Sequence, residues 1–281
     1  MLHLIASTGR TATSFIAACL DQVPGVAGCH EGHQRNDDGP DLLPMINLEN
    51  FQAFRDPEAA VRIVGEKRNQ DVIDQAKSAS GCDVVVDAAY YNATIGAALL
   101  ATNSDTRVLG IVRDCESFVR SATWLSGEDP MPVGWPAPTK PLTARERFIG
   151  MGRIRPTAGP ELDLWSEWEA IQRNVWLWRE TNSRLCDMRD EHPDRVSILN
   201  FDALRGRAAE FVKDVVVELE VLSTPDYDDI LTGAVDGAQD RVNVRSGGYQ
   251  IPASTDWSNN ERDMLEHASA EIETRLKNEP S

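Results

Sequence analysis

Residues 7–14, with the sequence STGRTATS, gather the side chains best suited to holding an anion. Gly9 and Arg10 are followed by hydroxyl side chains at positions 11, 13 and 14. A guanidinium, several hydroxyl donors and the free backbone N–H groups at the start of a helix can together hold a phosphate. The segment therefore predicts a phosphate cradle near the beginning of the chain. An ordinary turn with Thr and Ser as helix caps would leave the same pattern, and this alternative stays open.

The predicted cradle differs from two common nucleotide loops. A Walker A loop needs a second glycine followed by Lys and then Ser or Thr, and a Rossmann loop needs three spaced glycines. Here no Lys follows Gly9, and the later glycines are absent. The loop therefore does not predict Walker-type Mg²⁺-ATP chemistry or a dinucleotide site.

A second strand and helix carry another guanidinium and another hydroxyl. The apolar run Val108–Val112 is typical of a strand buried on both faces of a parallel sheet, and ligands bind at the carboxyl ends of such strands. Arg113 stands at this end, and Ser121 lies eight positions later on the predicted helix that follows. The segment predicts a second anion-binding unit at the same sheet edge. The alternative is that Arg113 pairs with Asp114 or Glu116 while Ser121 is a solvated helix residue.

Strands and helices must bring these two units together. Apolar runs predict strands at residues 2–6, 84–86 and 108–112. Apolar residues at helical spacing predict helices over residues 162–189 and 257–277. The alternation of buried strands with helices favours an α/β fold with a central parallel sheet.

The two anion-binding units together resemble motifs of the sulfotransferase family that uses 3′-phosphoadenosine 5′-phosphosulfate (PAPS). Arg10-Thr11-Ala12-Thr13-Ser14 is similar to its 5′-phosphosulfate loop, and Arg113 with Ser121 is similar to its 3′-phosphate motif. Two looser matches are VSILNFDAL (196–204) and RVNVRSGG (241–248). The chain departs from the family pattern at Ala12 in the loop, at Cys115 after Arg-Asp, and after Asp87, where a Lys is often found.

The resemblance implies a P-loop-NTPase-like three-layer sandwich, with a central parallel sheet and helices on both faces. It also implies PAPS as the sulfuryl donor, adenosine 3′,5′-bisphosphate (PAP) as the product, and no metal. The donor-binding residues that it implies are Thr8, Gly9, Arg10, Thr11, Ala12, Thr13, Ser14, Arg113, Ser121, Arg245, Ser246 and Gly247. Arg10 would also be catalytic, because it would stabilise charge that moves to the leaving phosphate.

Three titratable side chains after the first helix are candidates for a general base. His30, Glu31 and His33 fall together at a predicted strand end or loop. Transfer of a sulfuryl group to a hydroxyl needs a group that takes the acceptor proton, and a carboxylate or a neutral imidazole can do this. Related sulfotransferases place a Glu at this point, so the resemblance favours Glu31. His30 and His33 remain alternatives, as does a solvated loop with no catalytic role.

The acceptor side is predicted more loosely. Candidate acceptor contacts are Asp87, Tyr90 and Tyr91 at a predicted strand end, together with Trp124. Prolines crowd residues 128–160, and helical or strand periodicity is lost there, which predicts an irregular loop. This loop would be either a lid over the acceptor site or an exposed insertion. The acceptor would be a small molecule or carbohydrate with a reactive hydroxyl or amine, and its identity is open.

The composition favours one globular domain over residues 1–281. No Gly/Ser-rich or charged linker divides the chain, and no apolar run approaches the length of a membrane helix. The formal net charge of −17 opposes binding to nucleic acid or anionic membranes. Five cysteines without a CxxC pair favour a reducing, cytoplasmic compartment, and the grouping of Cys29 with two histidines lacks a second set of zinc ligands. The sequence does not predict an oligomeric state.

Two other functions stay open. The first is a nucleotide kinase with a degraded phosphate loop, which would need a Lys among the phosphates and a carboxylate for Mg²⁺. The second is a nucleotide-binding module that has kept the fold and lost catalysis, to which the alanine at position 12 gives some support.

Overall fold

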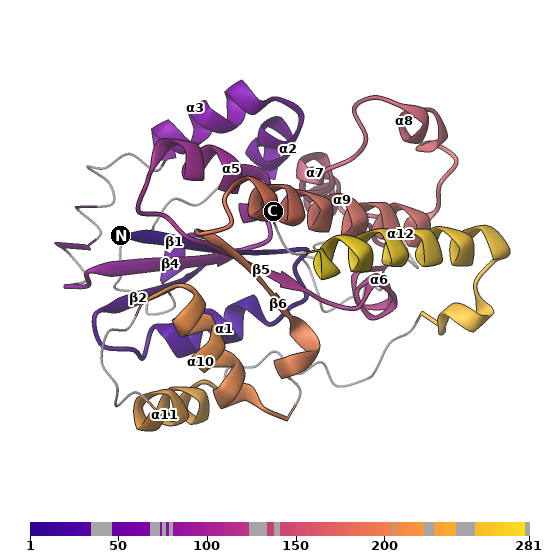
Figure 1. Ribbon diagram of the computed structural model, residues 1–281. Helices are drawn as coiled ribbons and strands as arrows, with labels where there is room; N and C mark the ends of the chain where they lie inside the picture. Colours follow the sequence, from indigo (N-terminus) through magenta and orange to yellow (C-terminus); the bar gives the residue numbers. More distant parts are fainter. Residues whose placement is uncertain are drawn as a thin grey trace.

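The computed structural model describes residues 1–34, 47–67, 74, 77–78, 81–123, 134–137, 141–204, 206–221, 228–239 and 251–278. In these residues strands and helices alternate along the chain (Figure 1). The strands are β1 (Leu2–Ser7), β2 (Val26–His30), β3 (His33–Gln34), β4 (Val84–Ala89), β5 (Val108–Val112) and β6 (Val196–Asn200). The α-helices are α1 (Thr13–Leu20), α2 (Asn47–Arg55), α3 (Pro57–Lys67), α5 (Asn92–Thr102), α6 (Cys115–Thr123), α7 (Ala144–Gly152), α8 (Pro160–Leu164), α9 (Ala170–Glu191), α10 (Ala208–Glu218), α11 (Asp228–Gln239) and α12 (Asn259–Lys277). Two short 3₁₀ turns cover Phe201–Leu204 and Ser254–Asp256.

The strands form one sheet in the order β3-β2-β4-β1-β5-β6. Five of them run parallel, and β3 pairs antiparallel with β2 at one edge. The central strand β1 lies between β4 and β5, with Leu4 opposite both Asp87 and Val108. The loops that follow β1, β4 and β5 therefore leave the same edge of the sheet at neighbouring positions.

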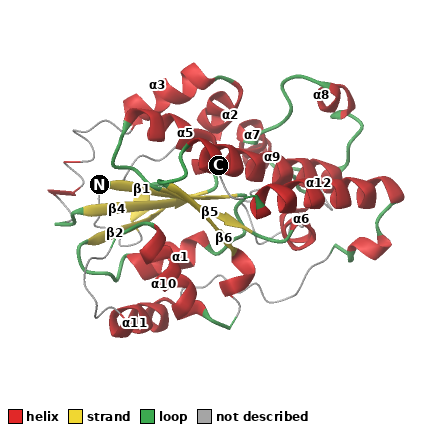
Figure 2. Cartoon of the chain, viewed as in Figure 1, coloured by secondary structure: helices red, strands yellow, loops and turns green. Residues whose placement is uncertain are grey.

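Helices cover both faces of this sheet, as Figure 2 shows. One face packs against α2, α3, α5, α6, α9 and α12, and the other packs against α1, α10 and α11. Alternate residues of each strand enter the two cores; in β4, for example, Val85 and Ala89 face the first core, whereas Val86 and Ala88 face the second. The predicted α/β architecture, with a parallel sheet between two helical layers, is confirmed.

One predicted helix is interrupted. The periodic stretch over residues 162–189 is divided into α8 and α9, with a turn between them. The backbone of Glu169 is extended, and this residue begins α9 through a reciprocal capping box with Gln172. The expectation of one continuous helix was wrong: a turn separates α8 from α9, and the rings of Trp165 and Trp168 in this turn region lie 5.8 Å apart.

The segment predicted to be irregular, residues 128–160, contains the nine-residue helix α7. Thr143 and Glu146 begin it with a capping box, a local signal that the proline count obscured. At its end Gly152 packs so tightly on α2 that an added Cβ would lie 1.9 Å from the Asn47 carbonyl oxygen. The side-chain amide of Asn50 donates to the Gly152 carbonyl at 3.0 Å. These contacts fix the chain that leads from α7 back to the sheet edge.

In the described part of the chain, no helix combines the length and apolar character needed to cross a bilayer.

Candidate functional site

The loop after β1 has a conformation that is held by its own side chains. Gly9, Arg10 and Ala12 all have positive φ angles, of 77°, 60° and 56°. The Ser7 hydroxyl oxygen accepts hydrogen bonds from the Gly9 amide (3.0 Å) and from the Thr11 hydroxyl (2.8 Å). These two bonds stabilise a backbone turn that non-glycine residues otherwise avoid. The Gly9 amide is engaged within the loop in this conformation, and its predicted role as a phosphate donor stays a prediction.

Helix α1 starts from this loop without a side-chain cap. Its N-cap residue is Ala12, in the left-handed region, and no side chain accepts from the first helical turn. The helical ladder begins with the bond from the Ile16 amide to the Ala12 carbonyl at 3.0 Å. The alternative of Thr or Ser as the helix cap is therefore not observed. The absence of a side-chain cap on the first turn of α1 is compatible with the predicted phosphate cradle.

The two predicted anion-binding units meet directly. Arg113, at the end of β5, donates from Nη1 to the Arg10 carbonyl oxygen at 2.6 Å, although 103 positions separate them. In the other direction, Arg10 Nε donates to Ser121 Oγ on α6 at 3.0 Å. The two segments that carry Arg10 and Arg113 are therefore in direct contact at this sheet edge. The role of these side chains in binding a nucleotide stays a prediction.

Local contacts fix Arg113 in place. Its side chain is 8% exposed, its Nε donates to Ser117 Oγ at 2.8 Å, and its guanidinium lies 5.3 Å from the centre of the Phe201 ring. The neighbouring carboxylates have other contacts: Asp114 accepts from the Ser117 amide at 2.8 Å, and Glu116 accepts from the Ser254 hydroxyl at 2.8 Å. The alternative in which Arg113 serves mainly to pair with these two acids is therefore not favoured.

The base candidates lie on the β2–β3 hairpin. His30 and His33 form an opposed pair, and Glu31 and Gly32 make the turn between them. His30 Nε2 lies 3.2 Å from Thr13 Oγ1, so this imidazole contacts the start of α1. His33 is exposed, whereas Glu31 is partly buried. Of the three, His30 and Glu31 lie nearer the protein interior at this edge.

The surroundings of Glu31 favour its protonated form. Burial raises the pKa of the Glu31 carboxyl, and the Asp87 charge raises it further, while His33 lowers it. The same group of side chains includes Tyr90, whose pKa is raised by burial and by the Glu31 charge and is lowered by Arg153. A carboxylate with a raised pKa is a stronger base at neutral pH than an ordinary one, so this environment suits proton abstraction.

The predicted acceptor contacts differ in their exposure. Asp87 is fully buried, and Tyr91 is 3% exposed. Tyr90 is partly buried, packs edge to face on Tyr91, and lies with its hydroxyl 3.5 Å from Asn47 Oδ1. In this conformation Tyr90 is the accessible member of the three, and Asp87 contacts other protein groups.

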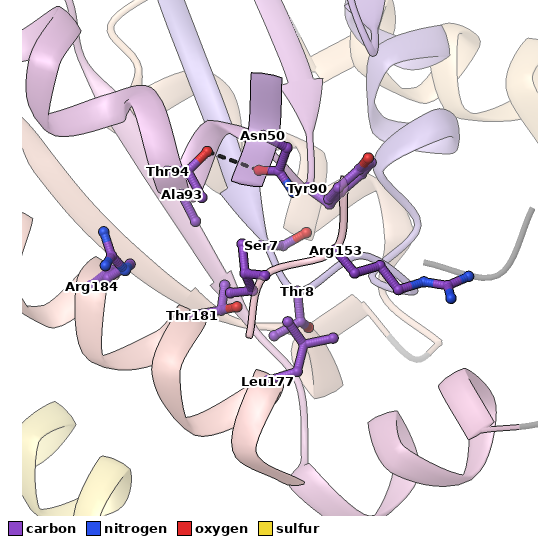
Figure 3. Close-up of a pocket in the computed structure, with 11 residues that line it drawn as sticks. Ser7, Thr8, Asn50, Tyr90, Ala93, Thr94, Arg153, Leu177, Thr181 and Arg184 are labelled. Atoms are coloured by element: carbon purple, nitrogen blue, oxygen red, sulfur yellow. Dashed lines mark hydrogen bonds between the residues drawn. The ribbon is translucent and has the colours of Figure 1, made fainter. Parts of the chain in front are cut away.

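A pocket opens beside the start of the loop after β1 (Figure 3). Its empty space measures about 380 Å³, counting the part open to solvent. Ser7 and Thr8 form one wall, and Arg153 and Ile154 bring the chain that follows α7 to another. In Figure 3 the Arg153 side chain extends away from Ser7 and Thr8, and the Thr94 hydroxyl donates to Asn50 Oδ1 at 3.0 Å. The remaining lining residues are Tyr90, Ala93, Leu177, Thr181 and Arg184.

Arg153 is the main charged residue of this region that motif reasoning missed. It is 5% exposed, burial lowers its pKa to about 10, and its guanidinium lies 5.5 Å from the centre of the Trp135 ring. Asn92 was missed as well: its amide bonds the β1 and β4 backbones from the first turn of α5. Neither residue belongs to a short motif, and only the proximity of Asn92 to the predicted strand end at residues 84–86 could have drawn attention to it.

Several predicted site residues lie outside the described residues, namely Trp124, Arg245, Ser246, Gly247 and parts of the 128–160 segment. Within the described residues, no group of three or more His, Cys, Asp or Glu side chains is placed to hold a metal ion.

No protein-family model matches the chain, and no curated protein matches it in sequence. Among solved structures, it is similar to a sulfotransferase domain from the curacin biosynthetic pathway, with 13% identity, a TM-score of 0.48, and coverage of 95% of this chain and 96% of that one. It is also similar to a sulfotransferase from Alicyclobacillus acidocaldarius, with 15% identity, a TM-score of 0.46, and coverage of 98% and 93%. A third is the sulfotransferase domain of the Synechococcus PCC 7002 olefin synthase, with 12% identity, a TM-score of 0.45, and coverage of 95% and 94%.

Proposed function

We propose that this chain is a sulfotransferase that moves a sulfuryl group from PAPS to a hydroxyl or amine of a small molecule or carbohydrate. The observation that carries the proposal is the junction of Arg10, Arg113 and Ser121. It brings the phosphosulfate-like loop and the 3′-phosphate-like motif into direct hydrogen-bonding contact. A donor with anionic groups at both its 3′ and 5′ positions needs two such units at one sheet edge.

The donor would be held by both loops. The first-turn amides of α1 and the hydroxyls of Thr13 and Ser14 would bind the 5′-phosphosulfate, since they face the edge where ligands of parallel sheets bind. Arg113 and Ser121 would bind the 3′-phosphate, the group that distinguishes this donor from ATP. Ser121 can accept from Arg10 and still donate its own proton to a phosphate oxygen, because a hydroxyl has one donor and two acceptor sites.

Transfer would then proceed in line. The acceptor oxygen forms a new bond to sulfur while the bond between sulfur and the bridging oxygen of PAPS breaks, so PAP leaves with the electron pair. Glu31 takes the acceptor proton, and Arg10 leaves Ser121 to stabilise the charge that grows on the bridging oxygen. The protein mainly positions the two substrates and stabilises charge, as in phosphoryl transfer.

A kinase-like reaction is the second candidate, and the position of Asp87 is the observation that favours it. Asp87 lies on β4 beside the loop-bearing strand β1, near the edge where Mg²⁺ would meet a phosphate. Its side chain, however, is fully buried, and its two oxygens accept from Gly32 and Asn92. PAPS-dependent transfer is therefore the stronger proposal.

A thermal-shift titration with PAP and ADP tests the donor assignment. The wild-type protein should bind PAP at least tenfold more tightly than ADP, and Arg113→Ala should remove most of that preference, because a charge-assisted hydrogen bond contributes about 1.5–3 kcal/mol. Arg207→Ala, which removes an exposed arginine paired with Glu210, is the matched control and should behave as wild type. Equal or reversed affinity for PAP and ADP in the wild type would refute the proposal.

Mass-spectrometric screening of an acceptor panel with PAPS separates an enzyme from an inactive module. An enzyme should add a sulfate to at least one hydroxyl or amine acceptor. Tight PAP binding without turnover over a broad panel would support the binding-module alternative instead.

A further inference from the structure

The turn that carries Glu31 has an unusual backbone for its sequence. Glu31 and Gly32 both have positive φ angles, of 55° and 79°, between the paired residues His30 and His33. Two successive positive φ angles define the tight hairpin turn of type I′, which Gly adopts freely but Glu does not. A contact outside the hairpin would offset the cost of holding Glu31 in this conformation.

Asp87 provides that contact. Its Oδ1 accepts from the Gly32 amide at 2.8 Å, and the Glu31 amide donates to the carbonyl of the next residue, Ala88, at 3.2 Å. The Asp87 side chain is fully buried in the sheet edge. Both turn amides are thus bound by the end of β4.

Asn92 continues the chain of contacts to the donor side. Its side-chain amide donates to the Asp87 carbonyl at 2.8 Å, to Asp87 Oδ2 at 3.4 Å, and to the carbonyl of Ile5 at 3.1 Å. Ile5 belongs to β1, the strand that leads into the phosphate loop. A continuous path of hydrogen bonds therefore joins the strand of the donor loop, Asn92, Asp87 and the turn that carries Glu31.

We propose that Asp87 is a positioning residue that fixes the Glu31 turn at a set distance from the donor loop. The proposal rests on the proposed function, in which Glu31 is the general base. A base must lie within hydrogen-bond reach of the acceptor proton, and a displacement of about 1 Å can cost about 10²-fold in rate. A buried carboxylate anchored at both oxygens is well suited to set such a distance.

The charge of Asp87 has a second effect on the same group. It acts together with burial to raise the pKa of Glu31, while His33 on β3 opposes it and Tyr90 faces Glu31 from the end of β4. Asp87→Asn should therefore lower the Glu31 pKa. The position and the basicity of Glu31 are thus both linked to Asp87, and two different substitutions can separate them.

The substitutions Asp87→Asn and Asp87→Ala separate anchoring from charge. An asparagine can keep an oxygen toward the Gly32 amide, although its NH₂ group would then face Asn92 and lose the longer 3.4 Å bond. An alanine removes both effects. Asp83→Asn, an exposed acid just before the opposite end of β4, is the matched control for loss of one negative charge.

NMR of the intact chain tests the anchor without any acceptor. Hydrogen exchange at the Gly32 amide should accelerate at least about tenfold in Asp87→Ala and change by less than about threefold in Asp87→Asn and Asp83→Asn. The Glu31 carboxyl resonance, assigned with Glu31→Gln, should titrate at a lower pH in Asp87→Asn than in the wild type. Unchanged Gly32 exchange in a folded Asp87→Ala protein would overturn the proposal.

Turnover with an acceptor from the screen gives the functional readout. In Asp87→Ala, kcat should fall at least about tenfold while KM for PAPS and the affinity for PAP stay within about twofold. In Asp87→Asn, kcat should be mostly retained, and the acid limb of the pH profile should move to lower pH. An equal loss in PAP affinity would mark Asp87 as a general fold residue and refute the positioning role. If the Asp87 variants give the expected NMR results but the wild-type protein shows no turnover, the proposed function is refuted while the structural role of Asp87 as an anchor of the Glu31 turn stands.

Discussion

The proposed donor side and the proposed acceptor side of the candidate site are built in different ways. On the donor side, the loops after β1 and β5 bond directly to one another through Arg10, Arg113 and Ser121. On the acceptor side, Glu31 and Tyr90 come from the ends of β2 and β4, and Arg153 comes from the chain after α7. The proposed donor side thus depends on direct hydrogen bonds between two loops, whereas the proposed acceptor side also depends on the packing of α7 on α2.

This difference predicts how each side responds to change. The donor loop keeps its shape through internal bonds such as Thr11 to Ser7, so its substitutions should alter chemistry more than folding. The acceptor side relies on close approaches such as that of Gly152 to Asn47, so even a methyl group there should disturb it. Donor binding and acceptor binding should therefore be separable by mutation.

Loss of Arg10 should produce the largest effect. We expect Arg10→Ala to lower kcat by about 10²–10³-fold, because the variant loses a preorganised charge on the leaving oxygen. Arg10→Lys should recover part of the rate, since it keeps the charge but not the planar guanidinium that donates to Ser121. Steady-state turnover with PAPS measures this, and an Arg10→Ala rate within threefold of wild type would contradict the assigned role.

A comparison of kcat between the variants Glu31→Gln and His30→Asn should identify the general base. We expect Glu31→Gln to lose about 10²-fold in kcat with unchanged affinity for PAP, because a glutamine cannot accept the acceptor proton. His30→Asn should lose far less, since His30 contacts Thr13 at the donor loop. The wild-type rate should fall at acid pH below the raised pKa of Glu31, where its carboxyl is protonated. A larger loss in His30→Asn would assign the base to His30 instead.

The sequence predicted, for a physical reason, that the loops after β1 and β5 meet at one sheet edge. Residues 8–14, Arg113 and Ser121 each follow a buried parallel strand, and the carboxyl ends of such strands necessarily meet at one edge. The same reasoning located Glu31 at the end of β2. The assignment of donor contacts to these residues stays a prediction.

The acceptor side could not be predicted to the same extent. Arg153 reaches this region because the end of α7 packs on α2, where Asn50 donates to the carbonyl of Gly152. This tertiary contact has no local sequence pattern. The choice of Asp87 as an acceptor contact took account of its place at a strand end but not of the Gly32 amide that binds it. The break before α9 could not be predicted from the spacing of apolar residues. The Trp165 ring packs 5.4 Å from the Trp176 ring across the turn, so apolar residues continue through it.

Gly152→Ala should lower the stability of the protein without changing the proposed donor side. Its Cβ would lie 1.9 Å from a backbone oxygen of α2, so the helices must move apart, at a cost of about 1–3 kcal/mol in free energy of unfolding. Gly150→Ala is the matched control in the same helix: the nearest atom to its Cβ would be Arg153 Nη1 at 3.4 Å. We expect that control to be neutral or slightly stabilising, because alanine favours a helix over glycine.

Urea unfolding and PAP titration of both variants check this prediction. Gly152→Ala should lower the urea midpoint, while a folded sample should keep wild-type affinity for PAP. Gly152 ends helix α7, whereas the proposed donor loops follow strands β1 and β5. A loss of PAP affinity equal to that of a donor-loop variant would show that the two sides form one unit and respond together to substitution.

The smallest effect should be a gain in stability at neutral pH when Glu31 becomes glutamine. Burial and the Asp87 charge raise the pKa of Glu31 in the folded protein, so the ionised carboxylate destabilises the native state. In the wild type, the contribution of this group is fully favourable below the pKa of an unfolded Glu and is lost as pH rises through the higher folded pKa. Glu31→Gln lacks this loss, so its melting temperature should exceed that of the wild type at pH 7, and the difference should shrink toward pH 4. Thermal unfolding across this pH range measures the difference, with Asp83→Asn as the control for an exposed acid. If the gain in melting temperature persisted unchanged at pH 4, the loss of charge at Glu31 would not be its cause. The proposed acceptor side would then lack a carboxyl with a raised pKa, the feature that distinguishes it from the proposed donor side.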